Sequence, residues 1–156
     1  MKTIIASIAL LCAPAVGAAQ EAHPAHTVIT PAQIVWTGGP PSLKPGAEAS
    51  VMFGDPSKEG LFAMCLKMPK GYQIAPHTHP KPEIVTVISG TFRIGMGETA
   101  DPAKAQPLSA GGFFGFPPGM THYASTDEDT VIQLNSTGPW TLTYVNPKDD
   151  PRQKSQ

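Results

Sequence analysis

Three histidines and one glutamate carry the clearest chemistry in this sequence. His77 and His79 are two residues apart, so on an extended chain both imidazoles project from one face, close enough to share an ion. Glu83 opens the next apolar run after a bend with two prolines, and a return of the chain there brings its carboxylate beside the imidazoles. A third imidazole is available at His122, which follows a second proline- and glycine-containing turn.

Three neutral imidazole nitrogens and one carboxylate oxygen form a borderline ligand set. Such a set suits one divalent transition metal ion, namely Fe, Mn, Ni, Cu or Zn. It leaves one or two positions for water or substrate when the coordination number rises above four. The alternative for each histidine is an ordinary surface or core position, and the alternative for Glu83 is a plain salt bridge.

The elements that must position these side chains are short apolar runs separated by turn residues. The runs cover residues 49–53, 61–68, 84–88, 91–95, 112–116, 130–135 and 140–145. Short strands at this spacing predict an all-β sandwich or barrel. The 15 glycines and 18 prolines agree with this prediction, because a chain with many turns uses both.

Two segments resemble the motifs of the cupin family. The first motif, Gly-x5-His-x-His-x3-Glu-x6-Gly, is matched at every fixed position by Gly71, His77, His79, Glu83 and Gly90. The second motif, Gly-x5-Pro-x-Gly-x2-His-x3-Asn, is matched by Gly111, Pro117, Gly119 and His122, whereas its last position is Thr126 instead of Asn. That position is usually structural in the family, so the departure leaves the metal assignment intact.

The resemblance covers roughly residues 46–146. It implies an antiparallel jelly-roll (double-stranded β-helix) barrel with one metal inside, and often a homodimer. It also completes the ligand set, so that the metal ligands are expected to be His77, His79, Glu83 and His122. The four motif glycines are expected to be turn residues with positive φ instead of ligand contacts.

The remainder of the chain is divided by composition. Residues 1–19 combine a positive start, an apolar run and small residues before a polar stretch, which predicts a signal peptide and a periplasmic or secreted protein; a retained anchor helix is the alternative. Residues 20–45 form a Pro-rich N-terminal arm with one expected edge strand at 26–29, residues 46–147 the barrel, and residues 148–156 a loose polar tail.

Composition excludes several partners. Lys and Arg number 11 against 12 Asp and Glu, so no nucleic acid is expected, and no membrane after signal removal. Cys12 leaves with the signal and Cys65 is then alone, so no intramolecular disulfide forms and a packed role for Cys65 is favoured over a redox role. His23 and His26 in the arm are interpreted as solvated residues, with an external metal contact as the alternative.

Function is less determined than the metal site. The first hypothesis is a metal-dependent enzyme acting on a small organic molecule, either dioxygenase-like or a lyase or isomerase. The alternatives are a non-catalytic small-molecule or metal-binding protein and a domain whose metal is structural or sensory. Tyr72, Gln73 and Gln133 are possible hydrogen-bonding partners for a ligand, and no catalytic acid or base is assigned.

The size of the barrel interior separates these hypotheses. An open cavity of a few hundred Å3, in the range of ordinary ligand pockets, favours an enzyme or binder. A barrel plugged by Phe114, Phe116 and Met120 favours a structural metal. Aromatic residues such as Trp140 and Tyr144 are expected in the core more often than in a pocket.

Overall fold

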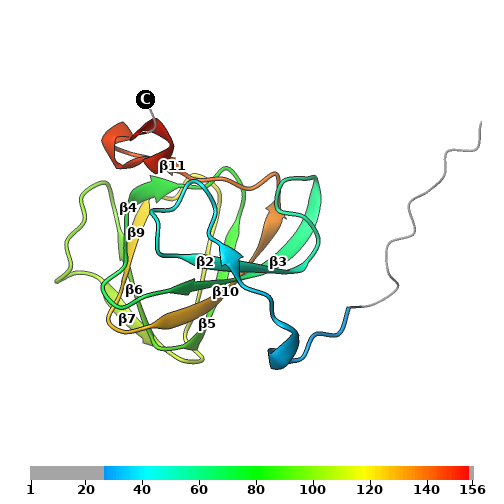
Figure 1. Cartoon of the computed structure of the whole chain (residues 1–156). Helices are drawn as coiled ribbons and strands as arrows, with labels where there is room; N and C mark the ends of the chain where they lie inside the picture. Colours follow the sequence, from blue (N-terminus) through cyan, green and yellow to red (C-terminus); the bar gives the residue numbers. More distant parts are fainter. Residues whose placement is uncertain (1–26, 155–156) are drawn as a thin grey trace, which may run out of the picture.

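The computed structural model describes residues 27–154, which form two antiparallel sheets around one core (Figure 1). One sheet has six strands in the order β1 (Thr37–Gly38), β2 (Glu48–Phe53), β3 (Gly60–Met68), β10 (Thr130–Gly138), β5 (Glu83–Ser89) and β8 (Phe113–Phe116). The other has five, in the order β11 (Thr143–Tyr144), β4 (Gln73–Thr78), β9 (His122–Thr126), β6 (Thr91–Met96) and β7 (Gln106–Ser109). The predicted all-β jelly-roll barrel is confirmed.

Strand β10 shows how the sequence pattern sets the inner and outer faces. Its side chains alternate strictly between buried and half-buried along nine residues. It pairs with β3 from Thr130↔Met68 to Gly138↔Gly60, and with β5 on its other side. Because alternate residues of paired strands share a face, this register directs Ile132, Leu134 and the inward residues of β3 into one apolar core.

The predicted strands match the observed ones with instructive differences. All seven apolar runs contain strand, but the run at 140–145 forms only the short β11. The strands β1, β4, β7 and β9 were not predicted as separate strands, because their sequences are polar or contain proline. The expected edge strand at 26–29 is wrong for residues 27–29, which are not paired, since Pro31 begins a 3₁₀ turn, η1 (Pro31–Gln33), directly afterwards.

The C-terminal tail is more ordered than predicted. Two 3₁₀ turns, η2 (Pro147–Asp149) and η3 (Pro151–Lys154), lie beside β11 (Figure 1). Asp150 and Arg152 form an ion pair with 2.7 Å between the carboxylate Oδ2 and Nη2, and Nη2 also donates to the carbonyl of Leu142 at 3.1 Å. These contacts tie the tail to the barrel, so the expectation of a loose tail is wrong for residues 148–154.

Several predictions fall on residues outside the described range. The signal segment 1–19 and the arm histidines His23 and His26 belong to this group. Among residues 27–154, no helix has the length and apolar character needed to cross a membrane.

Candidate metal centre

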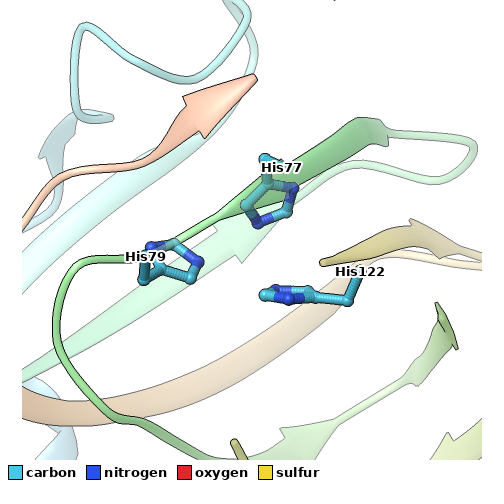
Figure 2. A group of neighbouring side chains, drawn as sticks. All are labelled: His77, His79 and His122. Atoms are coloured by element: carbon cyan, nitrogen blue, oxygen red, sulfur yellow. The ribbon is translucent and has the colours of Figure 1, made fainter. Parts of the chain in front are cut away.

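The three histidines converge on one point between the two sheets (Figure 2). His77 lies on β4 directly opposite His122 on β9, as residue partners of the strand pair. His79 follows the end of β4, and its ring lies 4.9 Å from that of His77 and 5.3 Å from that of His122, measured between centroids. Glu83 begins β5 in the other sheet. The alternation along β4 and its pairing with β9 therefore bring one nitrogen from each of the three imidazoles within 4.8 Å of the others, and the return into β5 places the Glu83 carboxylate beside His79 and His122 but outside that group of three.

Backbone carbonyls hold each imidazole in a defined orientation. The Nδ1 atoms of His77 and His122 lie 2.7 and 3.0 Å from the carbonyls of Ala75 and Met120, each two residues earlier in the chain. The Nδ1 of His79 lies 2.9 Å from the carbonyl of Thr141, 62 residues away. A carbonyl can only accept, so each Nδ1 carries the proton and each Nε2 is left with a lone pair, the arrangement usual for metal-binding histidines.

The positions of the donor atoms fit a metal ion. One nitrogen from each of the three histidines lies within 4.8 Å of the others. The Glu83 carboxylate places Oε1 3.4 Å from Nε2 of His79 and Oε2 3.1 Å from Nε2 of His122. Two ligands on one ion at bonds of about 2.1 Å are separated by about 3.0 Å in octahedral and about 3.4 Å in tetrahedral geometry. The contacts of Glu83 fall at these values.

Two of the donor atoms are buried without a hydrogen-bond partner in the described part of the chain, which increases the need for a cation between them. The Nε2 atom of His79 and the Oε2 atom of Glu83 are buried and have no hydrogen-bond partner among residues 27–154. Lone pairs of buried acceptors that face one another repel in a medium of low dielectric constant. A divalent ion between them removes both the repulsion and the unmet coordination, so the residues present fit such an ion.

Electrostatics keep the imidazoles in the state that binds metals. Burial, reinforced by the neighbouring rings of His122 and His79, lowers the pKa of His77 from 6.5 to about 3. Burial also lowers the pKa of His79, an effect that the Glu83 carboxylate opposes. Both rings are thus neutral at physiological pH, and their lone pairs are available to an ion without competition from protons.

The cavity beside these donors is small and apolar. Its volume is about 20 Å3, and its walls are the four donor residues, Trp140 and aliphatic or aromatic core side chains, among them Phe114. This space holds an ion with about one water. Phe116 is not a wall residue, but its ring packs against His122 at 5.1 Å. The interior therefore lies between the two expected extremes and is close to the plugged one.

The other sequence candidates lie away from this cavity. Tyr72 is buried, and its hydroxyl donates to the carbonyl of Lys44. Gln73 is exposed, and Gln133 donates to Asn135 on the outer side of the sheet. None of these three residues lines the cavity with the histidines. Cys65 is buried, and burial raises the pKa of its thiol, as expected for a packed residue.

The contacts of Thr126 explain why the second motif can have threonine in place of asparagine at its last position. Its hydroxyl donates to the carbonyl of Pro69 at 2.6 Å and accepts from the amide of Tyr72 at 3.0 Å. Both contacts fix the turn that leads into β4, so the side chain is structural. The four motif glycines, Gly71, Gly90, Gly111 and Gly119, all have the predicted positive φ, between 75 and 84°.

Two parts of the site were not predicted. The indole of Trp140 stacks on His79 with 4.8 Å between centroids and 18° between planes, although the sequence favoured a core role. Thr141 orients His79 through a backbone carbonyl. The proline before Trp140 was the available signal that the strand breaks there, whereas a backbone carbonyl has no signature in the sequence.

Comparison with known proteins identifies the domain. The sequence model described as "Cupin domain" matches residues 64–136, a range that contains all four donor residues. The chain contains a cupin domain. The resemblance of its two motifs is thereby confirmed, and the cupin fold agrees with the two-sheet barrel described above.

Relatives and solved structures extend the comparison. "Germin-like protein 5-1" from Oryza sativa subsp. japonica is 41% identical over 71 residues, which are 42% of this chain and 32% of that protein. The chain thus spans about a third of the length of the curated relatives that it matches. The polyketide cyclase RemF from Streptomyces resistomycificus has a TM-score of 0.65 at 12% identity, covering 82% of this chain and 91% of its own.

A third neighbour is a putative acetylacetone dioxygenase from Methylibium petroleiphilum PM1. Its TM-score is 0.62 at 18% identity, covering 85% of this chain and 89% of its own. Identities this low establish the shared fold alone. The cupin domain therefore has enzymes among its structural neighbours and holds three buried histidines that could bind a metal.

Proposed function

We propose that this chain is an exported, mononuclear metal-binding cupin and that its ion serves an enzyme reaction of a small molecule. One observation carries the metal site: three buried imidazoles with ligand nitrogens within 4.8 Å of one another have their Nδ1 atoms fixed by carbonyls, and the Nε2 atoms of two of them, His79 and His122, face the Glu83 carboxylate. His77, His79 and His122 would hold the ion with Glu83 as the fourth ligand, which would also balance its charge. When bound, such an ion supplies Lewis-acid or redox chemistry.

The residues around the site limit what can reach the ion. A cavity of about 20 Å3 admits about one water-sized group beside the ion, which is either a very small ligand or the reacting end of a larger molecule. The apolar walls exclude bulk water, which strengthens every electrostatic contact inside. Glu83 is the only carboxylate among the wall residues, so it is the group that would accept a proton if it left the ion.

A second function is favoured by the same small cavity. The ion could be structural, with the barrel closed around it, because the volume is well below the several hundred Å3 of ordinary ligand pockets. The two functions differ in whether a coordination position is open to small molecules. The enzyme hypothesis needs such a position, and the structural hypothesis needs none.

Metal analysis followed by an oxygen-uptake screen tests the proposal. We expect about one transition metal ion per chain in protein purified without added metal, and a loss of this ion in Glu83→Gln. Oxygen uptake with an enolisable compound such as acetylacetone, chosen because one structural neighbour is a putative acetylacetone dioxygenase, would support a dioxygenase. Metal without turnover of any tested compound would move the assignment to a structural ion, and purification without metal would contradict the site.

Export is part of the proposal and has its own test. The apolar start of the chain followed by small residues supports a cleavable signal. We expect mature protein in a periplasmic extract with Ala19 or Gln20 as its first residue, determined by mass spectrometry. An intact Met1 in that fraction would contradict cleavage.

We also propose a homodimer that forms through the outer face of the six-stranded sheet. This face exposes Ile84, Ile88 and Phe113, and the outward side chains of β3, β10, β5 and β8 are uncharged except Lys67, which pairs with Glu48 at 2.9 Å. Five of its strands, from β2 to β8, give a width of about 24 Å and a flat area of about 600 Å2. Because side chains protrude from the sheet, the accessible surface is larger than this flat area and approaches the area of about 800 Å2 that each partner of a stable complex buries.

Light scattering of purified protein tests the dimer. The wild type should have twice the mass of one chain, and Ile84→Lys should have the mass of one chain because it buries a charge in the contact. Gln73→Lys, which adds the same charge to an exposed position on the other sheet, should remain dimeric. A monomeric wild type, or a dimeric Ile84→Lys variant, would contradict this interface.

A further inference from the structure

The indole of Trp140 forms one wall of the metal cavity. Its ring stacks on His79, and its edge contacts Phe62 at 6.3 Å between centroids. It lines the same 20 Å3 space as the four donor residues. The position is set by the backbone, because the amide of Trp140 donates to the carbonyl of Pro56 at 2.8 Å. The indole is thus held beside the ion site from two directions.

The Nε1 atom of Trp140 is a buried donor without an acceptor among the described residues. Two other buried polar atoms share this state, Nε2 of His79 and Oε2 of Glu83, and a metal ion explains both. It cannot explain Trp140, because the indole N–H is only a donor and does not bind cations. A buried donor left unmet is destabilising, so this group calls for an acceptor that residues 27–154 do not themselves provide.

The cavity walls contain no alternative donor for a ligand. No Lys or Arg is among them, and the Nδ1 atom of each histidine is already used by a carbonyl. The indole N–H is therefore the one uncommitted donor of the wall residues. A ligand that reaches this space with an oxygen or nitrogen acceptor would be next to both the ion site and the residue that carries this donor.

We propose that Trp140 is the hydrogen-bond donor that recognises a small ligand beside the ion. The ligand class is a small neutral or anionic species that places a terminal oxygen or nitrogen acceptor in this space, which has room for about one water-sized group beside the ion. This inference rests on the proposed metal site. It gives Trp140 a role in ligand affinity that packing against His79 alone does not require.

Trp140→Phe tests the role, because phenylalanine keeps an aromatic ring against His79 and removes the donor together with part of the indole ring system. The protein is loaded with Co2+, and azide is titrated while the visible absorption of the cobalt is recorded. The azide Kd should rise about 10-fold to 150-fold, the effect of losing one hydrogen bond to a charged group. The Co2+ affinity should change less than about 3-fold, since no metal ligand is lost.

A matched control is available at the second tryptophan. Trp36 is half-buried, and Lys67 lies over its ring with Nζ 5.8 Å from the centroid, outside the cavity. Trp36→Phe should leave the azide Kd unchanged.

The outcomes separate this inference from the metal site itself. A wild type that does not bind Co2+ would overturn the proposed function and the role of Trp140 with it. Co2+ binding with no azide binding, or with equal azide affinity in Trp140→Phe, would overturn the role of Trp140 alone. Should the variant not fold, the indole N–H resonance of Trp140 in the 15N-labelled, Zn2+-loaded wild type decides: azide should shift it downfield, and an unmoved resonance would overturn the proposal.

Discussion

Replacement of His79 by alanine should separate metal binding from folding. His79 is 4% exposed and supplies an unpaired Nε2 to the site. Its loss leaves two imidazoles and one carboxylate for the ion, and it also removes the ring on which Trp140 stacks. The metal-free variant is thus expected to be somewhat less stable than the wild type, so the informative quantity is the stabilisation that added metal produces in each protein.

The size of that stabilisation follows from mass action. Free metal at 100 times its Kd raises the free energy of unfolding of the wild type by about 2.7 kcal/mol. For a chain of this length each kcal/mol corresponds to about 2–4 °C, so the wild type should gain about 5–11 °C. If the loss of His79 raises the Kd about 100-fold, the same metal concentration contributes about 0.4 kcal/mol. The variant should then gain only about 1–2 °C.

Differential scanning calorimetry with and without Zn2+ measures both shifts. A double variant, His23→Ala with His26→Ala, is the matched control, because it removes two histidines of the arm and leaves the site intact. It should gain as much as the wild type. Equal gains in unfolding temperature for His79→Ala and the wild type would refute the ligand assignment. If added metal does not raise the unfolding temperature of the control, the arm histidines bind the metal instead.

Two further predictions concern the parts that support the site. Arg152→Ala should weaken metal binding about 10-fold by releasing the segment that orients His79, whereas Arg93→Ala, whose partner is an exposed carboxylate, should not; competition with a chelating dye measures both. Gly90→Ala should lower the free energy of unfolding for two reasons. The strain of a non-glycine residue at a φ of +78° contributes about 1–2 kcal/mol. The clash of the new Cβ, which would lie 2.5 Å from a carbonyl oxygen, contributes about 1–3 kcal/mol more. Gly71→Ala, with a φ of +75° and open space, should show only the first loss in urea denaturation, and equal losses would contradict the clash.

The sequence predicted the parts of the site that depend on local spacing. Two histidines at an interval of two fall on one face of any strand, and the carbonyls that orient His77 and His122 are only two residues away. Local backbone geometry therefore sets both position and tautomer. The motif glycines were predictable for the same reason, since a positive φ is a local requirement.

The unpredicted parts depend on packing between distant segments. The run at 140–145 reads as a strand, yet only Thr143 and Tyr144 pair with β4. The residues before them leave the sheet, which lets Trp140 lie against His79. The tail reads as loose because it is charged, but the charges of Asp150 and Arg152 satisfy each other at 2.7 Å. Periodicity and composition do not contain these long-range contacts.

His79 is consequently the ligand whose orientation depends on the completed fold. Its Nδ1 carbonyl belongs to Thr141, and Arg152 holds that segment through the hydroxyl of Thr141 at 3.3 Å and the carbonyl of Leu142 at 3.1 Å. His77 and His122 have no such dependence, since their carbonyls come from their own strands and turns. Two of the three imidazoles are therefore oriented by β4, β9 and their own turns alone, and the third depends also on the contacts of the tail. Metal affinity should accordingly depend on Arg152 through His79, and a variant of Arg152 should alter affinity more than it alters the unfolding of the barrel.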